Sequence, residues 1–551
     1  MTMQRWYVLV GFAILFLALR FPGTALPLHQ DEYKWPQIVN PAVASETEIP
    51  HPPLSQFIYQ TGGAVVGYDV HLRFVPLAFG LANLFLLWYW MRLRAGERAA
   101  LWAAALYALS FFSILASLMV DTDGQILPFF FLLALVGYER AQRGVVGWWG
   151  LVGAACLAGF LVKASFVLAI GAIAADMLWE RRALLLTRTI LRYVAAGASV
   201  IGALVLALLS AQLIFPFFDL TGSIHYWEHF ASFHHNWFQI AIQAIKAALY
   251  LSPLLVLMPL LATRDDFERV RPLVFFTCFG LFFYLILFDF SIGALDRYLQ
   301  FLIVPLVALA GVVLARTFPA IVRVSPHVLL AGVVAALGIF VVQYEPHAVP
   351  ALYPKAAWLG RIASFHWAFL YPFSGGSGPL TFYVSFLFLA LSWIVSGAIV
   401  TLAFFKRQWA PALIMLLLPL SLGYNAAFAE EYLLGHINGF APGLVERAAA
   451  FIANDADVQR VVVYNDNGGA EIQATGKYEK RLYTSPDFDW RDKARTINAF
   501  DGHYLVTDAP PIDPDSFFAK YFATCIPVYQ DTDRYMHATL YDCRKAPSIV
   551  L

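Results

Sequence analysis

The feature that most constrains this chain is a series of long apolar segments, each close to the roughly 20 residues that cross a bilayer as a helix. About thirteen such segments can be counted by this length criterion. They are 6–21, 70–91, 99–119, 124–138, 145–161, 164–179, 193–215, 239–262, 272–289, 298–315, 327–344, 380–404 and 410–428. Only 13% of the residues are charged, whereas soluble domains carry about 25%. The sequence therefore predicts a mainly α fold, a polytopic membrane helix bundle over residues 1–428.

Arginine and lysine residues indicate which ends of these helices face the cytoplasm, because they fall in alternate loops. The residues are Arg92, Arg94, Arg98, Arg140, Arg143, Arg181, Arg182, Arg188, Arg264, Arg269, Arg271, Arg316, Arg323, Lys406 and Arg407. This pattern predicts a cytoplasmic N-terminus, outer loops at 22–69, 216–238 and 345–379, and an outward-facing segment after Glu430. The first apolar run lacks a small-residue cleavage site, so we interpret it as a membrane helix and not as a signal peptide.

Residues 429–551 differ from the rest, because their apolar runs are short and charged and turn residues occur throughout. Three apolar runs predict buried strands, at 460–464, 503–507 and 538–541. A fourth run, 444–453, predicts an amphipathic helix. We therefore expect a small C-terminal α/β extracytoplasmic domain. Cys525 and Cys543 lie in it, and an oxidising compartment would favour a disulfide between them. The alternative is two buried thiols.

Unusual polar residues gather in the predicted outer loops. They are Asp31, Glu32, Tyr33, Glu48 and His51 in the first loop, Asp121, Asp123 and Lys163 at later outer turns, and His225, Glu228, His229, Asp296 and Arg297 further along the chain. Charge held at a membrane boundary is costly, so it indicates a functional site. The formal net charge of +0 argues against a nucleic-acid partner, which requires a basic surface. The sequence also contains no phosphate-cradling P-loop motif.

These residue types suit the transfer of a sugar from a lipid phosphate. A carboxylate would take the proton of an acceptor hydroxyl, cations would stabilise the departing phosphate, and aromatic rings would stack on the sugar. A transporter could display the same residue types, so composition alone leaves both classes open.

The order of the motifs resembles integral-membrane glycosyltransferases of the C-type fold, in particular protein O-mannosyltransferases and lipid A aminoarabinose transferases. The motifs that carry the resemblance are Asp31-Glu32, His51-Pro52-Pro53-Leu54, Asp123 followed by Leu133-Ala134-Leu135, the hairpin 157–163 ending at Lys163, Tyr226-Trp227-Glu228-His229-Phe230, and Arg297-Tyr298-Leu299. They cover about residues 1–310, and the remainder is similar only in architecture. Two departures concern His51, where aminoarabinose transferases carry Lys, and Ala231-Ser232, near which family members often carry Arg.

The resemblance implies a role for each of these residues. Asp31 would be the general base, and Glu32 would assist it. Asp123 would orient a substrate, with Asp121 as the lesser alternative for this role. Lys163 and Arg297 would bind the leaving phosphate, and further substrate contacts would come from Tyr298, His51 and Tyr33. Glu48 and His229 would hold a divalent metal ion, if one is required.

Each role has a purely structural alternative. Asp31 or Asp123 would cap a helix, and Lys163 would extend to the membrane interface. Arg297 would pair with Asp296, and His229 would belong to a hydrogen-bonded aromatic belt.

These observations predict a polyprenyl-phosphate-sugar-dependent glycosyltransferase that transfers a hexose or pentose to a hydroxyl of a lipid, glycan or protein. The active site and the C-terminal domain would face the periplasm of a bacterial inner membrane, and the products would be cell-envelope glycans such as modified lipopolysaccharide. Two alternatives remain. A lipid-linked glycan ligase or polymerase would usually have a very long outer loop with paired Arg residues, and a secondary transporter would place charges near the membrane midplane.

Overall fold

The computed structural model divides the chain into two compact units, which are described separately. Unit 1 comprises Met1–Thr24, Trp35–Gly332 and Ser396–Ser421, and unit 2 comprises Ala25–Lys34, Val333–Val395 and Leu422–Leu551. The structure describes residues 3–42, 51–182, 190–215, 218–231, 235–290, 295–321, 324–345, 347–351, 355–373, 380–465, 467–482 and 490–548.

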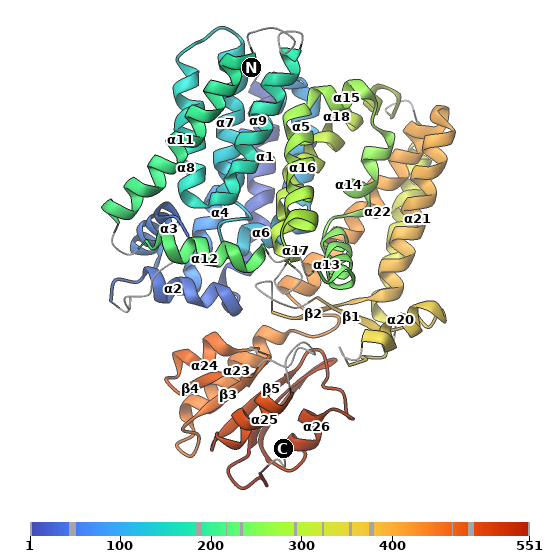
Figure 1. The fold of residues 1–551 in the computed structure, drawn as a ribbon. Helices are drawn as coiled ribbons and strands as arrows, with labels where there is room; N and C mark the ends of the chain where they lie inside the picture. Colours follow the sequence, from blue (N-terminus) through green and yellow to red (C-terminus); the bar gives the residue numbers. More distant parts are fainter. Residues whose placement is uncertain are drawn as a thin grey trace. The chain divides into compact units, whose positions relative to one another are not determined.

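Unit 1 is almost entirely helical (Figure 1). Its helices include α1 (Met3–Ala18), α2 (Lys34–Val39), α3 (Pro53–Val66), α4 (Phe74–Arg94), α5 (Glu97–Leu109), α6 (Phe111–Leu118), α7 (Ile126–Gln142), α8 (Trp148–Val162), α9 (Val167–Glu180), α11 (Ile190–Ile214), α12 (Leu220–Phe230), α13 (Trp237–Tyr250), α14 (Pro253–Leu257), α15 (Arg264–Arg269), α16 (Arg271–Phe282), α17 (Leu295–Tyr298) and α18 (Ile303–Ile321). Parts of α19 (Pro326–Phe340), α21 (Phe386–Phe405) and α22 (Ala410–Leu433) also belong to this unit. Tight helical turns extend several of these helices: η3 (Val70–Arg73), η4 (Ala164–Phe166), η5 (Met258–Leu261) and η7 (Leu299–Leu302). A wider π-helical segment, η6 (Phe283–Leu287), continues α16. α4 packs against α5 and α7, α7 packs against α8, and α18 packs along α5.

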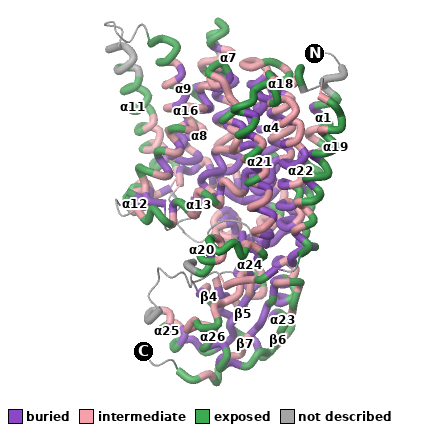
Figure 2. The backbone as a smooth tube through the Cα atoms, turned by 90° about the vertical axis from the view of Figure 1, so that its right-hand side faces the viewer, coloured by how far each residue is buried: buried purple, intermediate pink, exposed green. Residues whose placement is uncertain are grey.

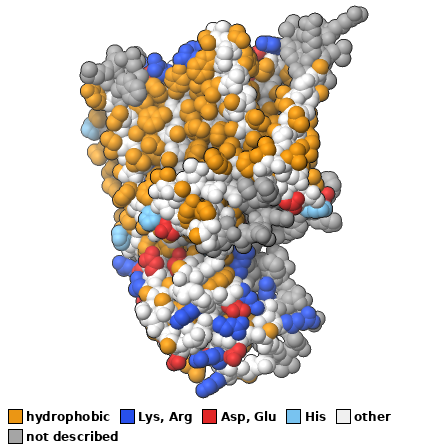
Figure 3. All heavy atoms as spheres, turned by 90° about the vertical axis from the view of Figure 1, so that its left-hand side faces the viewer, with side chains coloured by type: hydrophobic (Ala, Val, Ile, Leu, Met, Phe, Trp, Pro, Cys, Tyr) orange, Lys and Arg blue, Asp and Glu red, His pale blue; other side chains and the backbone are white. Residues whose placement is uncertain are grey.

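Several helices are long and apolar enough to cross a membrane. In the described part of the chain there are 7, or up to 9 if each bent pair of helices counts as one span. Only 6% of the residues in the span Gly197–Ile214 of α11 are buried, and Figure 2 accordingly colours α11 mostly as exposed or intermediate. Figure 3 likewise shows hydrophobic side chains over a broad face of the helices. An apolar surface of this extent fits contact with lipid. The chain is therefore a multi-pass membrane protein, while the count of thirteen spans stays a prediction.

Two of the expected straight spans are bent pairs of helices. Segment 239–262 consists of α13 followed by α14 and η5, which meet at 111°. Pro253 is the first residue of α14, and a proline at this position starts a new helix because it has no amide hydrogen to donate to the preceding turn. Segment 99–119 consists of α5 and α6, which meet at 63°.

The bend between α5 and α6 is stabilised by Arg20, whose side chain is fully buried. Its guanidinium donates to the Ala108 carbonyl at 3.0 Å, to Ser113 Oγ at 3.0 Å and to Ser117 Oγ at 2.6 Å. It also lies 3.5 Å from the centroid of the Phe16 ring. Carbonyls at a helix end lack partners within the helix, so Arg20 satisfies one that the bend exposes.

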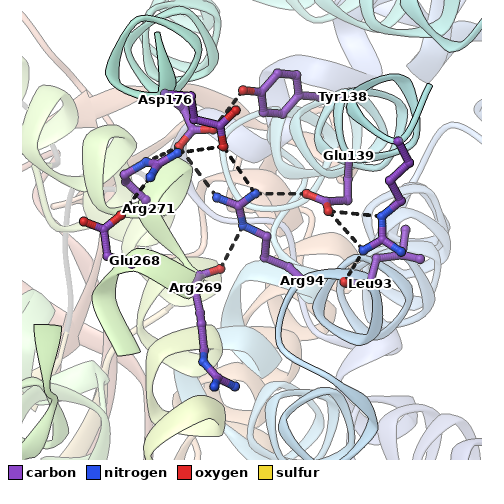
Figure 4. A network of polar contacts seen from close by, with 10 residues as sticks. Leu93, Arg94, Tyr138, Glu139, Asp176, Glu268, Arg269 and Arg271 are labelled. Atoms are coloured by element: carbon purple, nitrogen blue, oxygen red, sulfur yellow. Dashed lines mark hydrogen bonds and ion pairs between the residues drawn. The ribbon is translucent and has the colours of Figure 1, made fainter. Parts of the chain in front are cut away.

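Buried charges tie α4, α7, α9 and α16 together at one end of unit 1 (Figure 4). Asp176 is fully buried, with one oxygen 2.5 Å from Arg271 Nε and the other accepting a hydrogen bond from the Tyr138 hydroxyl at 2.9 Å. Arg94 lies 3.2 Å from Glu139 and 3.9 Å from Asp176. Because each of these charges has a partner of opposite sign, the cost of burying it is offset, and the four helix ends are held in one arrangement.

Unit 2 contains a five-stranded mixed sheet with the order β4-β3-β5-β7-β6. β3 runs parallel to β4 and β5, and β7 runs antiparallel to β5 and β6. The elements are α23 (Ala441–Asn454), β3 (Val461–Tyr464), α24 (Gly469–Ala474), β4 (Tyr478–Leu482), α25 (Trp490–Asn498), β5 (His503–Asp508), α26 (Phe517–Phe522), β6 (Ile526–Asp533) and β7 (Met536–Asp542). The buried cores on the two faces include Ile452 with Leu505, and Tyr504 with Phe522.

The three strands expected from apolar runs correspond to β3, β5 and β7, and the expected helix corresponds to α23. β4 and β6 lie at the two edges of the sheet, where polar and exposed residues interrupt the apolar pattern, so the sequence did not indicate them. The predicted Cys525–Cys543 disulfide is confirmed, and it joins the segments at the start of β6 and the end of β7.

A two-stranded hairpin lies at the end of the predicted outer loop 345–379. Its strands, β1 (Leu370–Phe373) and β2 (Phe382–Ser385), are antiparallel. Leu370 and Tyr383 share a buried cluster with Leu444 of α23 and Met536 of β7. Within unit 2, the hairpin is therefore packed against the elements of the five-stranded sheet.

Candidate active site

The loop between α6 and α7 carries Asp121 and Asp123 in unit 1. The Tyr59 hydroxyl of α3 donates a hydrogen bond to the Asp121 carbonyl at 2.7 Å. At Gly124, a Cβ would lie 2.5 Å from Gln300 Oε1 and 2.9 Å from the Ala116 carbonyl, so only glycine fits without a shift of these atoms. The loop is thus clamped between α6 and η7, and this fixes the direction of its two carboxylates.

Asp123 forms a buried ion pair with Lys163, the residue directly after α8. The distance from Lys163 Nζ to Asp123 Oδ2 is 2.5 Å, and the two side chains are 8% and 5% exposed. Asp123 does not cap α7, whose first turn is preceded by Gln125, and Lys163 does not reach an exposed interface. The structural alternatives for both residues are therefore wrong.

Arg297 approaches Asp121 from α17. Its Nε lies 3.4 Å from Asp121 Oδ2, and its terminal nitrogen donates to the Tyr298 hydroxyl at 3.1 Å. Asp296, the alternative partner of Arg297, pairs instead with Lys246 of α13, whose Nζ lies 2.9 Å from Asp296 Oδ2. Arg297 therefore faces the acidic loop, while its neighbour is held by another helix.

The ring of Tyr298 lies beside both cations. Lys163 Nζ is 4.8 Å and the Arg297 guanidinium carbon is 4.9 Å from the ring centroid, within the range of cation–π attraction. Tyr298 also stacks on Tyr284 of η6, with ring centroids 5.5 Å apart and an interplanar angle of 8°. The sequence did not single out Tyr284, because η6 reads as part of an apolar span.

Burial shapes the electrostatics of this cluster. It raises the pKa of the Asp121 carboxyl above its usual range, Arg297 opposes that rise, and Asp123 adds to it. Burial alone would lower the pKa of Lys163, but the adjacent Asp123 carboxylate reverses this, and the net change is a rise. Lys163 is therefore a permanent cation, whereas the Asp121 carboxyl takes up a proton more readily than an exposed aspartate does.

A small cavity of about 30 Å³ opens beside Asp123. Its polar wall is formed by Asp123, Ser165, Tyr284 and Tyr298, and its apolar wall by Leu127, Pro128, Phe131, Phe166, Leu168, Ala169, Phe276 and Phe301. A cavity of this volume holds about one water molecule, so a larger ligand would enter by displacing the aromatic side chains. The wall composition suits a ligand with a polar head and an apolar chain.

Asp31 and Glu32 lie in unit 2, in the short helical turn η2 (Gln30–Tyr33), which packs against α24. Asp31 pairs with Lys34, and its side chain is 39% exposed, so water or a hydroxyl can reach it. Glu32 is buried, and its Oε2 accepts a hydrogen bond from the His29 amide at 3.0 Å. Glu32 therefore holds the turn that presents Asp31.

The remaining predicted site residues are described to different extents. Tyr33 and His51 are half-buried. Glu48 lies outside the described residues, and of His229 only the position in α12 is described. Over the described ranges, no group of three or more His, Cys, Asp or Glu side chains could hold a metal ion. The metal site stays a prediction.

Comparison with known proteins gives matches of two kinds. The family model for dolichyl-phosphate-mannose-protein mannosyltransferase matches residues 50–214. ArnT from Cupriavidus metallidurans in the apo state is similar in structure, with a TM-score of 0.54, 14% sequence identity, and coverage of 97% of this chain and 98% of that chain.

The structure of ArnT from Cupriavidus metallidurans bound to undecaprenyl phosphate has a TM-score of 0.52 and 15% identity, and the match covers 98% of both chains. No curated protein matches by sequence. At this level of identity, the structural likeness shows the fold. The resemblance seen in the motifs is confirmed: this chain has the fold of the C-type integral-membrane glycosyltransferases.

Proposed function

We propose that this protein transfers a sugar from a polyprenyl-phosphate donor to a hydroxyl acceptor at the periplasmic face of a bacterial inner membrane. The observation that supports this best is the position of Lys163 and Arg297, two largely buried cations that pair with the carboxylates of the acidic loop and lie next to Tyr298. Both cations contact residues that line the polar wall of the cavity: Lys163 pairs with Asp123, and both lie beside the ring of Tyr298. A lipid phosphate combines the same two requirements, since its head needs cations and its chain needs apolar contacts.

In the proposed reaction, the acceptor oxygen attacks the anomeric carbon of the sugar while Asp31 takes the hydroxyl proton. The bond between the anomeric carbon and the phosphate oxygen breaks, and its electron pair leaves with the polyprenyl phosphate. Lys163 and Arg297 stabilise the negative charge on that phosphate. A single displacement of this kind inverts the configuration of the sugar.

Other residues would orient the substrates. Asp123 accepts a hydrogen bond from Lys163 at 2.5 Å and would hold this cation toward the donor. His51 and Tyr33 would contact a substrate, and Glu32 would support Asp31. Glu48 and His229 would hold a divalent metal ion, if the reaction requires one.

The proposed arrangement assigns residues 1–428 to the catalytic membrane domain and 429–551 to a periplasmic domain over which the acceptor approaches. The acceptor class is a lipid, a glycan or a protein with a free hydroxyl. The fold and the mannosyltransferase family match support a transferase, and the undecaprenyl phosphate in the related ArnT structure supports the donor class.

The test is transfer of radiolabel from a panel of polyprenyl-phosphate sugars to acceptors in a membrane extract, with purified wild-type and Asp31→Asn proteins. Loss of the general base should lower turnover by about 10²–10⁴-fold. Asp457→Asn is the matched control, because Asp457 is an exposed acid of unit 2 and its replacement should leave transfer unchanged.

Label transfer by the wild type and the control, but not by Asp31→Asn, would support both the donor class and the base. Full activity of Asp31→Asn would remove Asp31 from the mechanism. If the wild type consumes no donor while a labelled solute crosses proteoliposomes, the protein is a transporter and the proposal is wrong.

A further inference from the structure

The cluster at the candidate site carries no net charge before any donor arrives. Its two cations, Lys163 and Arg297, are matched by two carboxylates, Asp123 and Asp121. The exposed fractions of these four side chains lie between 5% and 12%. Each positive charge that a phosphate would use is therefore already balanced by a carboxylate of the chain.

A polyprenyl-phosphate sugar is a phosphodiester with one negative charge. If it binds between these cations, two carboxylates and one phosphate share two positive charges, and the site becomes net negative. An uncompensated charge in a buried site is expensive, and groups in such sites change their protonation state instead. The charge balance therefore calls for one proton to enter with the donor.

Asp121 and Asp123 are not equal candidates for this proton. Asp123 already accepts a hydrogen bond from Lys163 at 2.5 Å. Asp121 Oδ2 is buried, lies 3.4 Å from Arg297 Nε, and accepts no hydrogen bond from the residues that the structure describes. Burial also raises the pKa of Asp121. Protonation therefore costs least at Asp121.

We propose that donor binding is accompanied by uptake of one proton on Asp121, and that its new hydroxyl group donates a hydrogen bond to a phosphate oxygen next to Arg297. The inference rests on the proposed function and assigns to Asp121 a role that the motifs do not. The groups that face its carboxyl are Arg297 of α17, Lys163 at the end of α8, and Asp123 with the Thr122 amide of its own loop.

The test measures binding of the methyl diester of undecaprenyl phosphate to the full-length protein in lipid nanodiscs between pH 5.5 and 8.5. This probe keeps one negative charge throughout, so its own titration does not contribute. If one proton is taken up, the Kd should rise about tenfold per pH unit above the pKa of Asp121 in the ligand-free protein and level off below it. Calorimetry in buffers of different ionisation enthalpy counts the protons directly.

The Asp121→Asn variant separates proton uptake from a structural role of the carboxylate. Asn is neutral, has nearly the same shape and can donate to the phosphate, so this variant should bind the diester tightly and with a Kd that does not depend on pH. Asp296→Asn is the matched control, since it removes a buried carboxylate beside Arg297 that pairs with Lys246, and its Kd should retain the pH slope.

Three results would overturn the inference: a wild-type Kd without pH dependence and with no proton uptake, a pH slope retained in Asp121→Asn, or loss of diester binding in a folded Asp121→Asn protein. The wild-type calorimetry decides the matter even if the variant does not fold. Absence of diester binding to the wild type at every pH would instead overturn the proposed donor, and the inference with it.

Discussion

Replacement of Lys163 by Met should destabilise unit 1 strongly, because it leaves the Asp123 carboxylate buried without its nearest cation. At an effective dielectric constant of 20, two unit charges 2.5 Å apart attract by about 7 kcal/mol. Much of this attraction offsets the cost of taking both groups out of water. Removal of one partner of a buried pair typically costs about 3–5 kcal/mol in the free energy of unfolding.

The double variant Lys163→Met/Asp123→Asn distinguishes the charge effect from lost packing. With both charges gone, most of the lost stability should return, because a neutral replacement of a buried ion pair is often close to neutral in energy. Unfolding by SDS in mixed micelles, followed by circular dichroism, measures the free energy for each variant and gives the coupling of the two residues.

The same variants separate stability from function. Transfer of label should be absent in the single and the double variant, because both lack the cation that we propose binds the phosphate. Wild-type stability of Lys163→Met would refute the reasoning, since the pair would then contribute nothing. A double variant as unstable as the single one would also refute it, because packing and not charge would explain the loss.

Three further predictions concern the loop and the C-terminal sheet. Gly124→Ala should cost about 1–3 kcal/mol of stability through overpacking and lower donor affinity, since its Cβ would lie 2.5 Å from Gln300; wild-type binding and stability would contradict the clamp. Cys525→Ser should make the sheet of unit 2 sensitive to protease, as loss of a disulfide typically costs about 2–4 kcal/mol, and reduction of the wild-type protein should reproduce the effect. Burial lowers the pKa of His503 below 6.5. The stability that neutral, buried His503 contributes is therefore complete above pH 6.5 and is lost as the pH falls toward the folded-state pKa. His503→Gln should reduce this acid sensitivity, as thermal melting between pH 5 and 8 would show.

The fold could be anticipated from the sequence wherever apolar patterning decides the structure. The segments 124–138, 145–161 and 164–179 are short for membrane helices, yet they correspond to α7, α8 and α9. The buried strands β3 and β5 were also evident, because a strand surrounded on both faces reads as a continuous apolar run. Edge strands such as β6 mix polar and apolar residues, and this signal is too weak to identify them.

The composition of the candidate site was predictable, but its pairing was not. Sequence order indicated that Asp123, Lys163 and Arg297 would lie near outer turns. It offered a pair with the neighbouring Asp296 as the structural alternative for Arg297. The actual partner is Asp121, 176 positions away, and only the packing of α17 against the acidic loop brings the two together.

Arg20 shows why a residue that supports the site from outside it gives no signal in the sequence. In the sequence it is one basic residue at the end of the first apolar run, and such residues usually extend to the interface. In the structure it turns inward and binds the Ala108 carbonyl and two serine hydroxyls of α6. The bend that it stabilises directs α6 into the loop that carries Asp121. The geometry of the charged cluster therefore depends on the Arg20 guanidinium, although none of the hydrogen bonds described for Arg20 reaches a residue of that cluster. Arg20 acts by satisfying a carbonyl at the end of a helix, and no catalytic motif marks such a role.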